Sequence, residues 1–201
     1  MTAQPIESAS APTPEKRAQP SYFWTRVPPK AGPDGADLAA LRRGAGRPPG
    51  SVPAMWRFYT ALSADGGVSP RLAAEHHALT LYAIHQQSQS KPMHQQGNGV
   101  GSAAKALRAS GTFSPDAVDR RLNAAATATS LEECAYHLRG LVRQFKQIGQ
   151  PLDYSALVRD LTDWQYPERA ARVRRRWGSQ YFLGRGDSPA GAPADGAQTT
   201  I

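Results

Sequence analysis

The sequence predicts an all-α protein, a single compact bundle of about eight helices between two disordered tails. Apolar residues recur at three- and four-residue spacing through most of the segment between residues 37 and 182, which is the pattern of helices with one buried face. Ser-Pro pairs and glycines, which begin and end helices respectively, separate the periodic segments. No segment alternates apolar and polar residues as a half-buried strand does, so no strand is predicted.

The composition divides the chain into one folded domain and two tails. Residues 1–20 and 184–201 are poor in large apolar side chains, and we expect both to be disordered. Residues 21–183 form the predicted helical domain, which is long enough to bury roughly two-thirds of its unfolded surface. The aromatic residues 22–24 are expected to dock on its core, with a partner-binding anchor as the alternative.

Four helices are expected in the first half of the domain, at residues 37–43, 54–62, 70–87 and 102–110. In the second of these, Met55, Tyr59 and Leu62 fall on one side and should face the core. The polar loop at 88–101 is long for a compact domain, and such loops are usually functional or mobile. It ends in GNGVG, which lacks the GK[ST] of a phosphate-binding loop, so we interpret its glycines as a source of flexibility.

Four more helices are expected in the second half, at residues 115–128, 130–148, 153–164 and 167–181. Ser114, Ser130 and Asp153 are good N-cap residues, and Glu133 completes a capping box with Ser130. Pro167 suits the first turn of the last helix. Asp160 and Asp163 are close enough in sequence to pair with Arg159 or with the arginine-rich last helix.

The positive charge is concentrated on the folded part of the chain. The net charge is +8, and residues 36–183 hold 19 basic and 11 acidic residues, whereas the flanks hold 5 of each. This distribution favours a polyanionic partner, with nucleic acid first and an anionic membrane second. Arginine outnumbers lysine 19 to 5, which suits bidentate phosphate contacts, although a GC-rich genome would produce the same bias.

Two of the predicted helices carry basic stripes. Arg139, Arg143 and Lys146 share a face of the helix at 130–148, about 135° away from its apolar stripe. A second stripe lies on the helix at 167–181, and the two together suggest one positive surface. Stacked like charges repel one another unless an anion is bound. Because few aromatic residues lie between these charges, backbone contact is expected rather than base stacking.

The sequence offers little support for catalysis or metal binding. The single cysteine, Cys134, cannot form an internal disulfide and fits a reducing cytoplasm. The five histidines show no i, i+4 pair and no HExxH, and no nucleophile elbow is present. We therefore predict no catalytic residue, no metal site and no cofactor. No signal peptide and no membrane span is visible, so a cytoplasmic protein is expected.

Six short motifs then occur in an order that resembles a known family. They are LRRG at 41–44, WxxY at 56–59, LYAIHQQ at 81–87, LRGLVRQ at 138–144, LDYSALVRDLTDW at 152–164 and VRRRW at 173–177. Together they resemble the CasB family, the small subunit of the type I-E CRISPR surveillance complex Cascade, over residues 21–183. Gln180 stands where the family has an acidic residue, which leaves the final turn in question.

This resemblance implies an all-helical, non-catalytic subunit. Two copies would lie head to tail beside the backbone subunits and the large subunit of the complex. Their basic surface would hold the displaced single strand of the target DNA, near the guide RNA, and so keep the R-loop open.

The candidate nucleic-acid-binding residues come from both arguments. The family motifs supply Arg42, Arg43, Arg139, Arg143, Arg174, Arg175 and Arg176. Charge and helical spacing add Lys105, Arg108, Arg120, Arg121, Lys146 and Arg172.

Two other functions remain open at the level of sequence. The chain could be an assembly adaptor whose basic face meets an acidic protein. It could also be a helix-turn-helix regulator built from residues 130–164, although the second helix offers only Ser155 and Arg159 for contact with bases.

Overall fold

The computed structural model describes residues 21–27 and 32–183, and the tails that we expect to be disordered lie outside these ranges. The described residues form helices and one isolated bridge, between His94 and Leu152, but no strand. The prediction of an all-α fold is therefore confirmed. The helices are α1 (Phe23–Arg26), α2 (Gly35–Arg42), the 3₁₀ helix η1 (Pro53–Phe58), α3 (Pro70–Gln86), α4 (Val100–Ala109), α5 (Pro115–Thr127), α6 (Leu131–Gln147), α7 (Tyr154–Trp164) and α8 (Pro167–Phe182).

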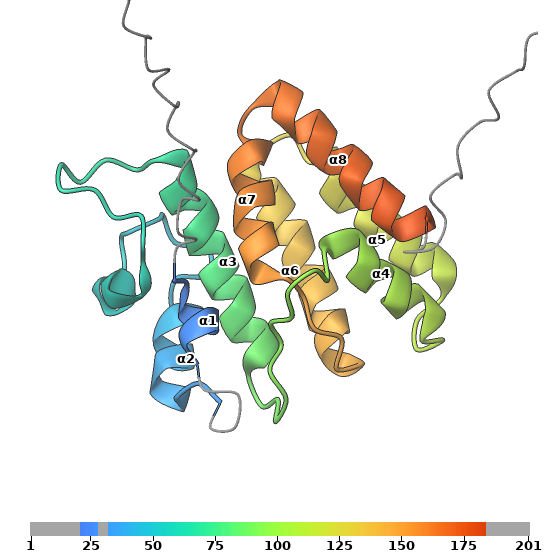
Figure 1. Ribbon diagram of the computed structural model, residues 1–201, viewed down its shortest axis with the longest axis horizontal. Helices are drawn as coiled ribbons and strands as arrows, with labels where there is room; N and C mark the ends of the chain where they lie inside the picture. The colour runs from blue at the N-terminus through green and yellow to red at the C-terminus, as the bar shows by residue number, and fades with distance from the viewer. Residues whose placement is uncertain (1–20, 28–31, 184–201) are drawn as a thin grey trace, which may run out of the picture.

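The long helix α3 organises one half of the molecule, and α8 organises the other. Helix α3 packs on α2, α6 and α7, whereas α8 packs on α4 and α7, and α5 packs on α4 and α6. Figure 1 shows α2 and η1 at one end of an elongated array, with α4 and α5 at the other. No helix in the described part of the chain is long and apolar enough to span a membrane.

The predicted N-caps form as expected. The side chains of Ser114, Ser130 and Asp153 accept hydrogen bonds from backbone N–H groups in the first turns of α5, α6 and α7. Glu133 reaches back beyond the N-cap and accepts a hydrogen bond of 2.7 Å from the backbone N–H of Thr129. These contacts satisfy donors that a helix start would otherwise leave unpaired.

The predicted helix at 54–62 is the main correction to the element assignment. It is a 3₁₀ helix that ends at Phe58, and Leu62 is 48% exposed rather than facing the core, although Met55 and Tyr59 are buried as predicted. The backbone N–H of Thr60 donates to the Glu75 carboxylate on α3, at 2.9 Å to Oε1. Helix η1 ends before Thr60 because the Thr60 N–H finds its acceptor on α3, in place of the carbonyl that a further helical turn would have supplied.

The loop at 88–101 also differs from the interpretation of a flexible segment. Leu152 donates its N–H to the Met93 carbonyl at 3.0 Å, and Gly97 donates to the Asp153 carboxylate at 2.8 Å. Helix α4 begins within it, at Val100. A Cβ at Gly101 would lie 2.1 Å from the Trp177 carbonyl oxygen, so the glycine allows α4 to approach α8 closely.

The aromatic residues before α2 dock on the core as predicted. Phe23 and Trp24 are buried, and the Trp24 ring centroid lies 5.7 Å from that of Tyr82 and 5.5 Å from that of Tyr154. The Trp24 indole N–H donates to the Ser155 hydroxyl at 3.0 Å. At the other end of the domain, Gln180 packs beside Gly99, and α8 continues through Phe182 despite the departure from the family pattern.

Candidate nucleic-acid interface

A group of basic side chains gathers along the outward face of α6. The apolar stripe of α6 is buried against its neighbours, which leaves Arg143 exposed and Arg139 and Lys146 half-buried at its edge. Arg42, at the end of α2, lines a hollow of about 750 Å³ together with Arg143 and Lys146. Helices α2 and α6, which are far apart in the sequence, thus bring three cations to one surface hollow.

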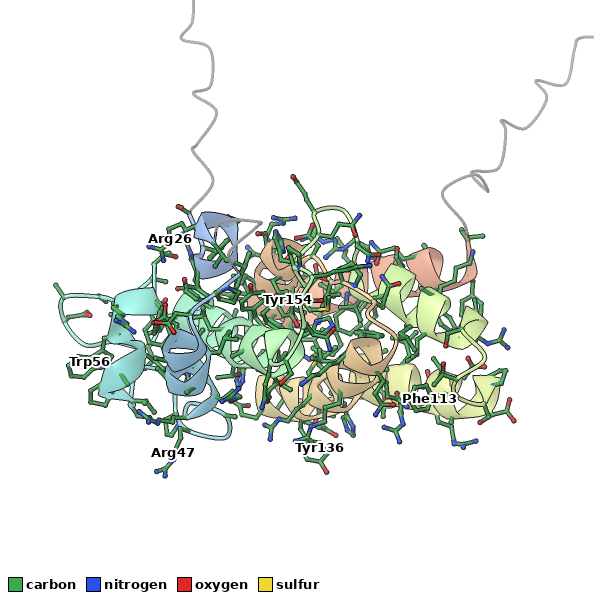
Figure 2. All side chains as sticks on the ribbon, turned by 90° about the horizontal axis from the view of Figure 1, so that it is seen from below. Arg26, Arg47, Trp56, Phe113, Tyr136 and Tyr154 are labelled. Carbon is green, nitrogen blue, oxygen red and sulfur yellow. The ribbon has the colours of Figure 1, made fainter. Side chains whose placement is uncertain are left out.

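Helix α5 adds a third helix to this group. A Cβ placed on Gly140 of α6 would lie 3.7 Å from a terminal nitrogen of Arg121, so the Arg121 guanidinium lies against that turn of α6. We call the resulting set the α6 basic band; its residues are Arg42, Arg121, Arg139, Arg143 and Lys146. Figure 2 shows the side of the molecule on which Arg47 and Tyr136 point outward, with α6 along the same edge.

The α6 basic band has no acidic partner among the described residues. Every ion pair in this part of the chain involves other basic residues, namely Arg57, Arg108, His137, Arg169 and Arg176. Burial lowers the pKa of the Lys146 ammonium, and the Arg42 charge lowers it further. A bound anion would reverse this repulsion, which makes the hollow a favourable place for a phosphate group.

Polar amides complete the hollow. Gln87, Gln89 and Gln147 line it beside the cations, and the Gln89 side chain donates to the Lys146 carbonyl at 3.4 Å. The sequence-based list of site residues contains none of these glutamines. Gln147 could have been found, because it lies four residues after Arg143 on the same helix, whereas no local signal marks Gln87 and Gln89.

Two of the predicted site residues on α8 instead make contacts within the fold. Arg174 donates to the carbonyl oxygens of Ala126 at 2.8 Å and Ala128 at 3.3 Å, and it covers the Trp164 ring. Arg176 pairs with the buried carboxylate of Asp160, as the sequence suggested for this aspartate. Both guanidinium groups therefore have partners within the fold, although both residues are exposed.

The two basic stripes do not form one surface, which corrects the expectation from their closeness in sequence. Arg172 and Arg175 are exposed, but α8 lies across the molecule from α6, in front of it in Figure 1 and at the opposite edge in Figure 2. Helix α4 lies between them and packs on both. The remaining candidates lie outside the hollow: Arg43, Lys105 and Arg120 are exposed, and Arg108 pairs with Asp119 at 3.2 Å.

Two buried histidines of the core have tyrosine hydroxyl partners. The His76 Nδ1 lies 2.7 Å from the Tyr59 hydroxyl, and the His85 Nδ1 lies 2.9 Å from the Tyr154 hydroxyl. Burial lowers the pKa of His85 to about 4, and it raises the pKa of the Cys134 thiol. No cluster of three His, Cys, Asp or Glu residues suited to a metal ion occurs in the described ranges.

The helix-turn-helix alternative does not fit the position of α7. This helix packs between α3 and α8, and Arg159 is its only exposed side chain. Ser155, the other candidate for contact with bases, accepts the hydrogen bond from Trp24. Helix α7 therefore leaves only Arg159 fully exposed for contact with a DNA groove.

The fold and the α6 basic band together define a helical protein with a surface suited to a polyanion. Residues 37–182 match the family described as CRISPR-associated protein Cse2, and the chain belongs to this family, which confirms the resemblance found in the sequence. None of the curated proteins compared with the chain matches it.

Several solved structures share the fold. CasB from Thermobifida fusca is 32% identical, with a TM-score of 0.60 over 73% of this chain and 83% of that chain. CasB from Thermus thermophilus is 26% identical, with a TM-score of 0.57 over 73% of this chain and 85% of that chain. A chain from a structure titled "CRISPR RNA-guided surveillance complex" has the same fold, with a TM-score of 0.61 at 24% identity over 74% of this chain and 82% of that chain.

Proposed function

We propose that this protein is the small subunit of a type I-E CRISPR RNA-guided surveillance complex, Cascade, and that it binds nucleic-acid backbone through the α6 basic band. The observation that carries the proposal is the cluster of Arg42, Arg143 and Lys146 around one hollow, without an acidic partner among the described residues. Membership of the Cse2 family supports the assignment to the complex.

The proposed mechanism is electrostatic and requires no catalysis, metal or cofactor. The exchange of a DNA duplex for a guide RNA–DNA heteroduplex is nearly balanced in energy, so modest contacts to the displaced strand can tip it. The α6 basic band would supply those contacts and hold the displaced strand away from its complement. The guide RNA, the target strand, the backbone and large subunits and a second copy of this chain are its proposed neighbours, in the cytoplasm and away from membranes.

The candidate residues divide into two groups under this proposal. The α6 basic band makes the principal phosphate contacts, and Arg43, Lys105, Arg108, Arg120, Arg172 and Arg175 contribute weaker, peripheral attraction. Arg174 and Arg176 stabilise the fold instead of binding nucleic acid, because their guanidinium groups are engaged.

An adaptor role is the second candidate, and three exposed apolar side chains favour it. Trp56 on η1, and Leu62 and Val68 between η1 and α3, are 52%, 48% and 57% exposed, and apolar side chains left in water are candidates for protein contacts. If they bind a neighbouring subunit, Leu62→Ser with Val68→Ser will reduce co-purification with that subunit and leave DNA affinity unchanged. Retained co-purification would assign the contact elsewhere.

A salt titration of the isolated protein tests the nucleic-acid contact. Affinity for a single-stranded oligonucleotide, measured by fluorescence anisotropy, should fall linearly on a log–log plot against salt concentration. The slope is about −0.7 for each phosphate contacted, so five band residues predict a slope near −3.5. No binding at low salt, together with intact co-purification with partner subunits, would favour the adaptor role.

A further inference from the structure

One aromatic side chain stands among the charges of the α6 basic band. Tyr136 is 66% exposed, and within the described residues its hydroxyl makes no hydrogen bond. Figure 2 shows it pointing away from the body of the protein. Its one aromatic neighbour in the described ranges is His137, with ring centroids 5.4 Å apart in a T-shaped arrangement. Most of the ring is therefore free to meet a ligand.

Helical geometry places Tyr136 in line with the cations. At 100° per residue, Arg143 lies about 20° from Tyr136 around the α6 axis and about 10 Å further along it. Arg139 lies between them, about 60° to one side. Arg121 approaches the same turn through Gly140. A strand whose phosphates follow the arginines would thus pass beside the tyrosine ring.

The acidic residues near Tyr136 determine on which side of the ring the phosphates of that strand would lie. Glu133 is occupied by the Thr129 N–H and hydroxyl, at 2.7 and 2.9 Å, and by His137. Glu132, one turn before Tyr136, is exposed and repels phosphate. The backbone should therefore run towards Arg143 and Lys146, with a base over the ring.

We propose that Tyr136 stacks on an unpaired base, so that the α6 basic band prefers single-stranded nucleic acid to duplex. This inference rests on the proposed function and narrows its ligand. Every base has a π-face, so stacking is independent of sequence, but a duplex hides those faces between neighbouring pairs. The band would then contact bases as well as backbone, in contrast to the expectation from the sequence.

Two single-stranded oligonucleotides of equal length separate stacking from charge. One is oligo(dT) and the other is its abasic counterpart, which keeps the phosphates and lacks the bases. Stacking of one base predicts that the full-length protein binds oligo(dT) about 5- to 150-fold more tightly than the abasic strand in fluorescence anisotropy. A duplex of the same length should bind more weakly than oligo(dT).

The variants assign that difference to one ring. Tyr136→Ala should lower the affinity for oligo(dT) to that for the abasic strand, whereas Tyr136→Phe, which keeps the ring, should preserve the preference. Tyr166→Ala is the matched control, because Tyr166 is an exposed tyrosine beside Arg169 at the start of α8. The Tyr166→Ala variant should prefer oligo(dT) to the abasic strand as strongly as the parent protein does.

The outcomes distinguish this inference from the function on which it rests. If the parent protein binds both strands equally, or if Tyr136→Ala keeps the preference for bases, the stacking contact is overturned and phosphate binding stands. If neither strand binds, the proposed nucleic-acid contact fails, and the stacking contact fails with it.

Discussion

Neighbouring arginines of α8 have different roles. Arg175 is exposed, whereas Arg176 pairs with Asp160, whose other carboxylate oxygen accepts a hydrogen bond of 2.7 Å from the Trp177 indole N–H. Burial raises the pKa of Asp160, and the hydrogen bonds from Trp177 and Arg176 oppose this by favouring the charged carboxylate. Arg176 therefore supports a charge that would otherwise be poorly solvated in the core.

Arg176→Ala should lower the free energy of unfolding by about 1–3 kcal/mol, because it leaves the buried Asp160 carboxylate without one partner. Arg175→Ala is the matched control and should change it by less than about 0.5 kcal/mol, as surface substitutions usually do. Urea denaturation of both variants measures the difference. Equal stability of the two variants would mean that the ion pair contributes nothing.

The lowered pKa of a buried histidine predicts that the protein loses stability in mild acid. Burial lowers the pKa of His85 to about 4, below its unfolded value near 6.5, so the unfolded state gains its proton first as pH falls. The contribution of neutral His85 to the free energy of unfolding is fully present above pH 6.5. About 3 kcal/mol of that free energy should be lost by pH 4. Urea denaturation across this range measures the loss.

A His85→Asn variant isolates this effect. Burial raises the pKa values of Glu75 and Asp160, so protonation of these carboxylates increases stability as pH falls. This opposes the effect of His85 over part of the same pH range. Comparison of the parent protein with the variant removes their contribution. A variant that loses as much stability as the parent between pH 6.5 and 4 would show that His85 is not the responsible group.

Among the elements, those with complete local signals were predictable. Helices α5, α6 and α7 each combine a capping side chain with an apolar stripe, and the structure has them close to the predicted bounds. The segment after Phe58 has similar helical spacing, but Glu75, distant in the sequence, takes its backbone N–H. The glycines before α4 were interpreted as flexible because the sequence does not reveal that α8 packs against them.

Two glycine substitutions should therefore have effects of opposite sign. Gly101→Ala places a Cβ against the Trp177 carbonyl oxygen and should destabilise the protein by roughly 1–3 kcal/mol, as overpacking does. Gly178→Ala, within α8, meets no atom within 4 Å and should stabilise it by about 0.5–1 kcal/mol. Thermal denaturation compares the two, and a stable Gly101→Ala variant would contradict the close approach of α4 to α8.

At the scale of the whole molecule, the sequence predicts that positive charge is concentrated on the folded domain, but not how it is distributed over the surface. The basic stripe on α6 shares a hollow with Arg42 of α2. No spacing rule in the sequence connects Arg42 with that stripe. The stripe on α8 lies across the molecule, and part of it is engaged within the fold. Tertiary packing thus decides which of thirteen predicted residues can bind the same ligand.

The most direct test of the account compares two charge reversals of equal size. Arg139→Glu with Arg143→Glu alters the α6 basic band, and Arg172→Glu with Arg175→Glu makes the same change in net charge on α8. Helical circular dichroism should be unchanged in both double variants.

The account predicts that only the α6 variant makes the log–log salt slope for single-stranded DNA shallower, by about 1.4, which corresponds to two lost phosphate contacts. The α8 variant should bind somewhat more weakly with the parent slope. An equal change of slope in both variants would show that the overall charge binds DNA, and would contradict a defined interface on α6.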